Sequence, residues 1–284
     1  MKYTIGLDVG GSKIFGGLFD AKYKLVHSKT IATPVGVSNK LLISLITEII
    51  QSLWPENIEK IGIGVAGFVQ NGILVKSPNM PKIKQLNFSK ELKKKFHVTI
   101  SVENDSRLFT LAESIIGSAK SARVVACVTF GTGVGGGLVV DKQIFHGGSG
   151  LAGEIGHTYF EGASFEQMFG GRNMVNHINA TFKTKFKNPT EVEKEIFSKT
   201  KLGKEMRKIH VYFIAKFFFN LILMYDPNMI VIGGSIGKRL ISKLIPEIKK
   251  ELHKCSKELG LPLHAQIKVS KLENSTSLGA VLIK

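Results

Sequence analysis

The chain has 284 residues, of which 43% are apolar and 21% charged, and its formal net charge is +17. This length allows two domains with ample cores, and the balanced composition excludes a fibrous or disordered protein. The surplus of lysine would suit a nucleic acid, a membrane surface or a polyanionic substrate. The lysines are widely dispersed, however, and no nucleic-acid-binding motif accompanies them. We therefore interpret them as a solvated surface, with neither nucleic acid nor membrane as a partner.

The N-terminus and the cysteines bear on the compartment. No cationic segment precedes an apolar stretch, since a strand already begins at Tyr3, so no secretion signal is recognised. The two cysteines, Cys127 and Cys255, lie far apart and form no motif. These features lead us to expect a reduced, cytoplasmic setting.

Residues 3–9 and 14–19 have the composition of strands, and a third strand is expected over 24–30. The turn Gly10-Gly11-Ser12-Lys13 is too short for a helical connection and indicates a hairpin. Its backbone N–H groups could cradle a phosphate, and Asp8 at the strand end could face a metal ion carried by that phosphate. The alternative is an ordinary turn beside an incidental carboxylate.

An amphipathic helix is expected over 38–53, followed by a strand at 60–65 and a hairpin around Asn71-Gly72. The loop Ser77–Pro81 contains Asn79, which could bind a polar ligand or merely its own turn.

A strand at 97–102 is followed by apolar residues at helical spacing up to Ile115. Asn104 and Asp105 therefore lie at a junction between strand and helix, where open α/β sheets hold their ligands. Either side chain could instead serve as the N-cap of the helix.

The buried strand 123–130 leads into Gly131-Thr132-Gly133-Val134-Gly135-Gly136, which matches the dinucleotide pattern G-x-G-x-x-G. That motif requires a following helix, whereas the residues to 145 indicate another hairpin, so we reject a dinucleotide fold. A second phosphate-binding turn, with the Thr132 hydroxyl contributing, remains.

The glycine-rich segment 147–157 carries Glu154 and His157 and is typical of a ligand-binding loop; no further Cys or His cluster supports a metal there.

Glu166 is expected to open a helix that runs toward Ile178. Residues 191–225 should form two helical pieces broken near Gly203, with the apolar run 211–219 a buried core helix, since it is short and contains Lys216.

The strand 229–232 runs into Gly233-Gly234 and an amphipathic helix to about 259, a third junction suited to a nucleotide. The chain closes with a strand at 265–269 and a short helix at 276–283.

The order and spacing of five motifs resemble the ROK family (repressors, open reading frames, kinases), which lies close to the bacterial glucokinases. The motifs are Asp8–Lys13, Asn104-Asp105, the Gly131 turn, Gly153-Glu154-Ile155-Gly156-His157 and Ile232-Gly233-Gly234. The resemblance spans nearly the whole chain. It implies an α/β, two-lobed actin-like/ribonuclease-H-like ATPase fold with mixed sheets and an active site in the interlobe cleft. We expect an N-terminal lobe of residues 1–116, with helix 272–284 packing back on it, and a C-terminal lobe of residues 117–271.

The resemblance implies an ATP-dependent hexose kinase, with glucose as the expected substrate and phosphorylation at its 6-hydroxyl. Asp105 would be the general base. The remaining implied roles are sugar binding by Asn79, Asn104, Glu154, His157 and Glu166; phosphate binding by Gly10, Gly11, Ser12, Lys13, Gly131, Thr132 and Gly133; adenosine contact by Gly233 and Gly234; and Mg²⁺ binding through water by Asp8. A homodimer would be in keeping with the resemblance.

Three departures from the family pattern stand out. The cysteine cluster that usually follows Gly-His and binds zinc with that His is missing after His157, so we predict no zinc site. Ser12 stands where Thr is commoner, which keeps the hydroxyl. Ser106 and Arg107 follow Asp105 in place of small residues, which alters the surroundings of the base.

Other functions remain open at this stage. An N-acetylmannosamine or N-acetylglucosamine kinase or a fructokinase would use the same residues. Inorganic polyphosphate would be an alternative donor for a basic protein. A sugar-sensing regulator is the non-enzymatic alternative, although the phosphate motif at Asp8 leaves no room for the DNA-binding domain that such regulators carry.

Overall fold

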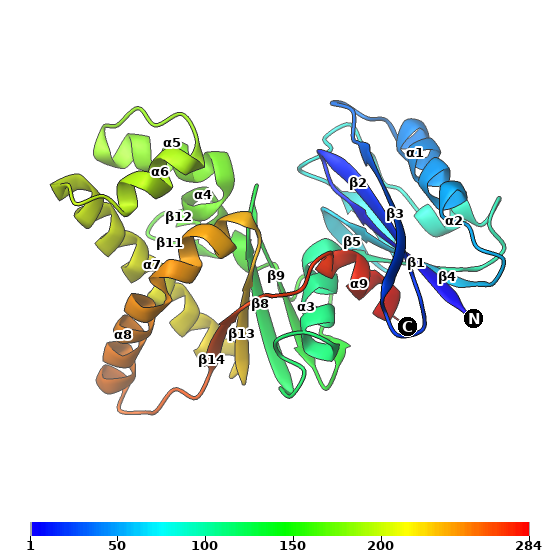
Figure 1. Cartoon of the computed structure of the whole chain (residues 1–284). Coiled ribbons are helices and arrows are strands. Elements are labelled where there is room, and N and C mark those ends of the chain that lie inside the picture. The colour runs from blue at the N-terminus through cyan, green and yellow to red at the C-terminus, as the bar shows by residue number, and fades with distance from the viewer. Residues whose placement is uncertain (1, 284) are drawn as a thin grey trace. The chain divides into compact units, whose positions relative to one another are not determined.

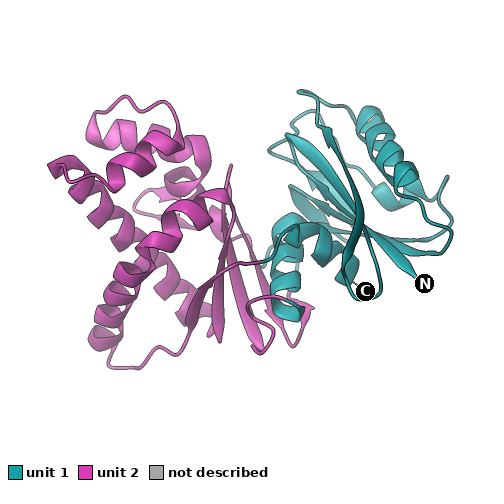
Figure 2. Cartoon of the chain, viewed as in Figure 1, with its two compact units in different colours: residues 1–116, 146–152, 272–284 teal, residues 117–145, 153–271 magenta. Residues whose placement is uncertain are grey.

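The computed structural model describes residues 2–283. The chain forms two compact units, shown in Figures 1 and 2. Unit 1 comprises Met1–Ile116, His146–Ala152 and Leu272–Lys284, and unit 2 comprises Gly117–Phe145 and Gly153–Lys271. The segment 146–152, which the sequence analysis placed in the C-terminal lobe, thus lies with unit 1.

Unit 1 is built on a five-stranded sheet in the order β3-β2-β1-β4-β7. Strands β1 to β3 are antiparallel, as the short glycine turn predicted, whereas β1, β4 and β7 run parallel. The strands are β1 Tyr3–Val9, β2 Lys13–Phe19, β3 Leu25–Ala32, β4 Ile58–Val65 and β7 Thr99–Asn104, and a small hairpin is formed by β5 Phe68–Gln70 and β6 Ile73–Lys76.

Helices cover both faces of this sheet. Gly16 of β2 lies against Ile49 of α1, whereas Gly6 of β1 and Gly62 of β4 lie against the backbone of α9. A Cβ at Gly62 would come within 1.8 Å of the Ala280 carbonyl oxygen, so only glycine lets α9 pack this closely. The helices of unit 1 are α1 Asn39–Ser52, α2 Phe88–Leu92, α3 Asp105–Ile115 and α9 Ser275–Leu282.

Unit 2 repeats the strand pattern of unit 1. Its sheet has the order β10-β9-β8-β13-β14, with β8, β9 and β10 antiparallel and β8, β13 and β14 parallel. The turn between β8 and β9 is therefore the counterpart of the turn between β1 and β2, and both glycine motifs lie on equivalent turns. The strands are β8 Val124–Phe130, β9 Val134–Val140, β10 Gln143–Ile144, β13 Met229–Gly233 and β14 Gln266–Val269.

The helices of unit 2 depart from the sequence prediction at two places. The helix expected from Glu166 toward Ile178 is divided at Gly170, where the backbone is extended. The break expected near Gly203 lies earlier, because Thr200 caps the second helix and accepts a hydrogen bond from the Gly203 N–H. The helices are α4 Phe165–Phe169, α5 Gly171–Phe182, α6 Pro189–Ile196, α7 Lys201–Tyr225 and α8 Ser242–Leu259, with the 3₁₀-helix η1 Ile155–His157, the π-helix η2 Gly237–Ile241 and the hairpin β11 Tyr159–Phe160, β12 Ala163–Ser164.

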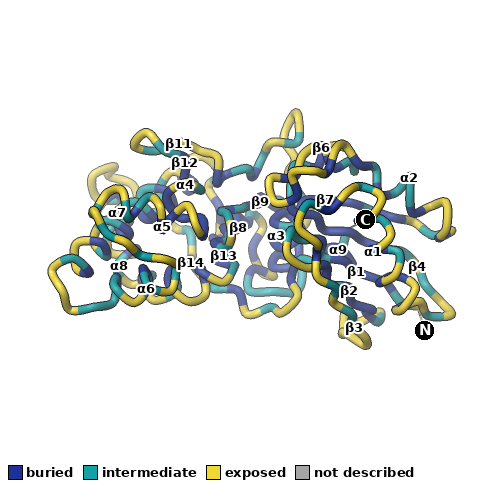
Figure 3. The backbone as a smooth tube through the Cα atoms, turned by 90° about the horizontal axis from the view of Figure 1, so that it is seen from above, coloured by how far each residue is buried: buried dark blue, intermediate teal, exposed yellow. Residues whose placement is uncertain are grey.

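The central strands of each sheet are largely buried, as Figure 3 shows. Helix α7 is long and apolar enough, by length and composition, to cross a membrane. Its buried residues, from Gly203 to Ile222, belong largely to the core of unit 2, where α7 packs against α8.

Candidate functional site

The turn between β1 and β2 offers open backbone donors. The Gly10 N–H donates to the Lys13 carbonyl oxygen at 3.0 Å, and the Thr33 hydroxyl donates to the Gly10 carbonyl oxygen at 2.7 Å. These bonds shape the turn, while the N–H groups of Gly11 and Ser12 find no acceptor within residues 2–283. N–H groups of a turn that have no such acceptor suit an anion.

Asn79 lies directly against this turn. A Cβ on Gly11 would come within 2.6 Å of the Asn79 carbonyl oxygen and 2.8 Å of its Cβ. The loop that carries Asn79 is held by the Ser77 hydroxyl, which donates to the Ala66 carbonyl oxygen at 2.7 Å. Asn79, a predicted sugar-binding residue, and the predicted phosphate-binding turn are therefore neighbours within unit 1.

Strand β7 ends at Asn104, and helix α3 begins at Asp105. Asn104 is the N-cap: its Oδ1 accepts the N–H groups of Ser106 and Arg107 at 2.9 and 3.0 Å, and its Nδ2 donates to the Gly67 carbonyl oxygen at 2.9 Å. One Nδ2 hydrogen remains for a ligand, since an amide has two. Asn104 is therefore the residue that caps α3, and the Asp105 side chain is available for a different role.

The Asp105 carboxylate is only partly engaged in hydrogen bonds within unit 1. Its Oδ1 accepts the Ser106 N–H at 2.8 Å, and the N–H of Asp105 itself also interacts with the carboxylate, while no other residue among 2–283 donates to Oδ2. Burial raises the pKa of Asp105 to about 6, partly offset by the hydrogen bonds from Ser106. A carboxylate with a pKa near 6 is a better proton acceptor than an ordinary aspartate and is still ionised at neutral pH.

Asp8 lies on β1, close enough to Asp105 for their charges to interact. Burial, and then the charge of Asp105, raise the pKa of Asp8 to about 7, while Lys13 acts in the opposite direction. The strand register explains the proximity: Asp8 is level with Gly64 on β4 and Glu103 on β7, so both carboxylates lie near the carboxyl ends of parallel strands. Ligand sites in open α/β sheets form at such ends.

In unit 2 the counterpart turn, Gly131–Gly133, has the same character. The Gly131 N–H donates to the Gly133 carbonyl oxygen at 2.9 Å, and the N–H groups of Thr132 and Gly133 have no acceptor in the described part of the chain. The N-terminus of α5 adjoins this turn, since the Gly171 N–H donates to the Gly131 carbonyl oxygen at 2.9 Å. Free N–H groups and a helix N-terminus together favour an anion.

The segment that carries Glu154 and His157 lies on β9. A Cβ on Gly153 would approach Gly137, and one on Gly156 would approach the Val134 carbonyl oxygen within 1.9 Å. The two glycines therefore let the backbone lie flat on the strand, and the intervening residues form η1 with Glu154 as its N-cap.

Glu166 lies over the second turn. Its Oε2 accepts the Val134 N–H at 3.0 Å and lies 2.1 Å from the position that a Cβ on Gly133 would take. The side chain is directed by α4, whose N-cap Ser164 forms a reciprocal capping box with Gln167. Glu166 is thus joined to the turn at 131–134, a contact that its sequence position alone did not indicate.

Gly233 and Gly234 end β13 beside the same turn. Gly233 is paired with Thr129 of β8, and a Cβ on Gly234 would come within 2.2 Å of the Phe130 carbonyl oxygen. Gly234 also has a positive φ of 76°, which L-residues other than glycine rarely adopt. The third glycine motif is therefore next to the second.

Sequence analysis did not identify several residues that the structure brings to these places. Gly170 and Gly171 start α5 at the second turn, and Glu103, Arg107 and His146 form a polar cluster near Asp105 in which Glu103 and Arg107 are buried and His146 is half exposed. In the sequence, this cluster is indicated by Arg107, which stands where the family pattern has a small residue.

No three His, Cys, Asp or Glu side chains within residues 2–283 are grouped as a metal site. Magnesium does not require such a group, because it is commonly held by one or two carboxylates together with water and substrate phosphates. The predicted absence of zinc remains a prediction.

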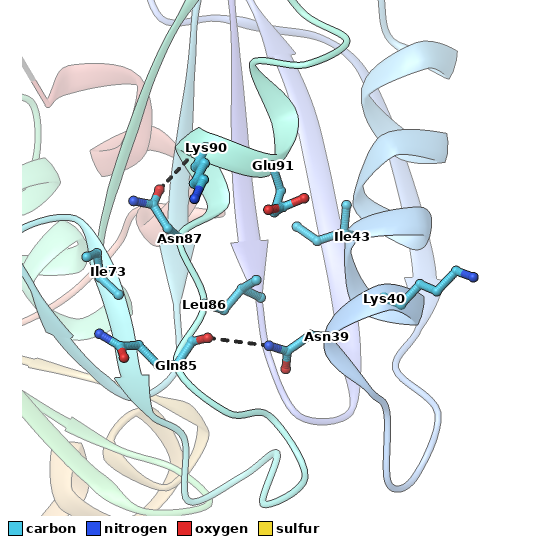
Figure 4. A pocket seen from close by; sticks show the side chains of 9 residues that line it. All are labelled: Asn39, Lys40, Ile43, Ile73, Gln85, Leu86, Asn87, Lys90 and Glu91. Atoms are coloured by element: carbon cyan, nitrogen blue, oxygen red, sulfur yellow. Dashed lines mark hydrogen bonds between the residues drawn. The ribbon is translucent and has the colours of Figure 1, made fainter.

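A separate pocket of about 520 Å³ lies on unit 1 and is shown in Figure 4. Two of its amide side chains are hydrogen-bonded to the backbone: Asn39 donates to the Gln85 carbonyl oxygen and accepts the Lys84 N–H, and Asn87 caps α2 by accepting the Lys90 N–H. None of the predicted site residues lines it.

Comparisons with known proteins give a consistent result. The model of the ROK family matches residues 4–283. The N-acetyl-D-glucosamine kinase of Aliivibrio salmonicida is 29% identical over 88% of this chain and 89% of that protein. The glucokinase of Streptomyces coelicolor is 30% identical over 55% of this chain and 50% of that protein. The crystal structure of the ROK hexokinase from Thermus thermophilus superposes with a TM-score of 0.84, at 21% identity, over 99% of this chain and 97% of that chain.

Proposed function

The chain belongs to the ROK family, and on that premise we propose that this sugar kinase transfers the γ-phosphoryl group of ATP to the 6-hydroxyl of a hexose, with glucose as the acceptor. The α/β fold expected from the sequence, of the two-lobed actin-like class, is confirmed by the likeness to the ROK hexokinase.

The observation that carries the proposal is the pair Asp8 and Asp105. Two interacting carboxylates with raised pKa values lie in unit 1, in which the glycine turn with free N–H groups follows β1 directly. A base, a candidate cation ligand and an anion cradle thus come from the ends of two parallel strands, β1 and β7, and from the turn that follows β1. This set matches the needs of phosphoryl transfer.

Asp105 acts as the general base. Its free oxygen accepts the proton of the sugar hydroxyl as that oxygen bonds to the γ-phosphorus, and the bond from the γ-phosphorus to the leaving oxygen of ADP breaks. A carboxylate in this role contributes roughly 10²–10⁴-fold to the rate. Most of the remaining acceleration comes from alignment and from neutralisation of the phosphate charge.

The phosphates are held by backbone N–H groups. Gly11 and Ser12 in unit 1, with Gly10 and Lys13 completing their turn, and Thr132 and Gly133 in unit 2, with Gly131 beside them, supply these donors. Gly233 and Gly234 contact the adenosine. The equivalence of the two turns in the two sheets supports a shared role.

The residues present fit a magnesium ion. Burial and the charge of Asp105 disfavour the ionised form of Asp8, so a cation bound nearby would strongly stabilise that ionised form. Bound Mg²⁺ would neutralise charge on the phosphates, and Asp8 would hold it through water.

The sugar is bound by polar side chains. Asn79, Asn104, Glu154, His157 and Glu166 supply carboxylate, imidazole and amide groups, which match the paired donors and acceptors of vicinal hydroxyls. The remaining Nδ2 hydrogen of Asn104 and the proximity of Asn79 to the first turn support their share of this role.

A second candidate substrate is N-acetylglucosamine, because the relative that matches over most of its length is named an N-acetyl-D-glucosamine kinase. A coupled assay of purified protein should compare ATP with polyphosphate as donor, across glucose, N-acetylglucosamine, N-acetylmannosamine and fructose. We expect turnover with ATP, highest with glucose. Preference for an N-acetylated sugar would replace glucose with that acceptor, and sugar binding without turnover would establish the regulator instead.

We further propose that the protein acts in the cytoplasm, without nucleic acid or membrane, and as a homodimer.

A further inference from the structure

Segment 146–152 belongs to unit 1, although the chain on either side of it, at Phe145 and Gly153, belongs to unit 2. It contains three of the four glycines between 146 and 153, and Gly147 and Gly150 have positive φ values of 71° and 79°. The Ala152 N–H donates to the His146 carbonyl oxygen at 3.2 Å and closes the segment into a loop. A loop of this composition has little stiffness of its own, so its position depends on what holds it.

A buried carboxylate holds the start of the loop. Glu103, which is 5% exposed, accepts the Asn104 N–H at 2.7 Å and the Arg107 Nη1 at 3.2 Å through Oε1. Its Oε2 accepts the His146 Nε2 at 2.6 Å. Both carboxylate oxygens are therefore engaged, one by its own strand and helix and the other by the loop.

Arg107 holds the far end of the loop. The side chain is 1% exposed, and its Nη2 donates to the Gly150 carbonyl oxygen. A third contact comes from Gln70, whose Nε2 donates to the Ser149 carbonyl oxygen at 3.2 Å. The loop is thus fixed at its beginning and near its end by two side chains that flank Asp105 in the sequence.

We propose that Glu103 and Arg107 are positioning residues for sugar binding, acting through His146 and Gly150. This inference rests on the proposed function and deepens it. Glu154 follows Gly150 by four residues. Because Arg107 holds Gly150 in place, it limits the positions that the chain leading to Glu154 can take. The same two positioning residues lie within two positions of Asp105, so the base and the loop 146–152 are held from the same strand–helix junction of unit 1.

The charges explain why Arg107 is required for this. Glu103 is buried within two residues of Asp105, and removal of its cationic partner would leave an uncompensated buried carboxylate. A neutral side chain at 107 would release the Gly150 carbonyl oxygen as well. Lysine would keep the charge but cannot bond Glu103 and Gly150 through two separate nitrogens.

The test uses four variants of the full chain: His146→Ala, His146→Gln, Arg107→Met and Arg107→Lys. His146 is half exposed, so its substitution is compatible with folding even where Arg107→Met is not. Arg123→Met is the matched control, because Arg123 forms an exposed ion pair with Asp141.

Amide hydrogen exchange of the free protein gives a readout independent of activity. We expect exchange in 146–152 to quicken by about tenfold or more in His146→Ala and both Arg107 variants, and to stay near wild type in His146→Gln, whose amide can still donate to Glu103. In the sugar kinase assay the KM for sugar should rise by roughly 10- to 100-fold in Arg107→Met, with a smaller rise in His146→Ala and little change in the KM for ATP.

Unchanged exchange in 146–152 for both His146→Ala and Arg107→Met would overturn the proposal. So would equal increases in the KM for sugar and for ATP, because these would indicate a general structural role. If the wild-type protein phosphorylates no sugar, the proposed function fails, and with it the assignment to sugar binding, whereas the exchange data still decide whether the cluster holds the loop.

Discussion

Asp8 and Asp105 are electrostatically coupled: burial, and after it the charge of Asp105, raise the pKa of Asp8 to about 7. The pKa of Asp105 is itself raised to about 6, chiefly by burial. Unit 1 therefore holds two carboxylates whose protonation at neutral pH depends on each other and on any cation beside them. The first three predictions follow from this pair.

Asp105→Asn should lower kcat by roughly 10²–10⁴-fold, because an amide cannot accept the hydroxyl proton. Sugar binding should persist, since the amide fills the same space. Steady-state kinetics and calorimetric titration with sugar measure the two effects, and Asp141→Asn, at an exposed position, is the control. Retention of most of the activity by Asp105→Asn would remove Asp105 from the role of base.

The pH profile should show one ionisation of the base. Asp105 must be deprotonated to act, so kcat/KM should fall as the pH decreases through about 6, approaching a tenfold loss for each further pH unit. The measurement is the kcat/KM for sugar between pH 5 and 8 at saturating Mg²⁺ and ATP. A flat profile down to pH 5 would show that no group of raised pKa limits the reaction.

Asp8→Asn should stabilise the free protein at alkaline pH. In the fold Asp8 holds its proton up to a pH of about 7, whereas its ordinary pKa is 3.8. The folded state thus binds this proton more tightly, and stability is lost as the pH rises from about 4 to 7. The variant avoids this loss, so its Tm without Mg²⁺ or nucleotide should exceed that of wild type at pH 8.

The same comparison supplies its own control. Near pH 4 Asp8 is protonated in the fold and about half protonated in the unfolded chain, whose pKa is 3.8, so the difference in Tm should be much smaller than at pH 8. Added Mg²⁺ and ATP should raise the Tm of wild type more than that of Asp8→Asn. A Tm difference that is equal at pH 4 and pH 8 would contradict the raised pKa.

Two glycines of one turn should respond differently to alanine. At Gly133 the new Cβ would come within 2.1 Å of the Glu166 Oε2, whereas at Gly131 it would meet no described atom within 4 Å. Gly133→Ala should therefore displace Glu166 and lower both the Tm and the kcat/KM for sugar, the latter by about tenfold or more. Gly131→Ala should leave the Tm unchanged. Thermal melts and sugar kinetics of the two variants test this prediction. Equal melting temperatures would show that Glu166 moves aside without loss of stability.

Purified protein should contain no stoichiometric zinc. The segment after His157 has no cysteine, and a zinc site of the expected kind would need thiolates. Elemental analysis by mass spectrometry, before and after dialysis against a chelator, measures the zinc content. One zinc per chain, with activity lost on chelation, would refute the prediction.

Local elements could be read from the sequence because their causes are local. The β1–β2 hairpin follows from the short glycine turn, and the start of α3 from Asn104 followed by apolar residues at helical spacing. The sequence predicts the break before α7 near Gly203, whereas it lies between Ile196 and Lys201. Gly203 instead lies inside the helix, where it allows close approach to the Glu195 carbonyl oxygen.

By itself the sequence determined the strands and turns, the position of Asp105 at a strand–helix junction and, through the order of its motifs, the family and fold class. Only the tertiary structure decided that Glu166 bonds the Val134 N–H and that Glu103 and Arg107 hold the loop 146–152. The physical reason is separation along the chain. Local backbone preferences act over a few residues, whereas Glu103 and His146 are 43 residues apart and meet only because the packed sheet and helix bring them together.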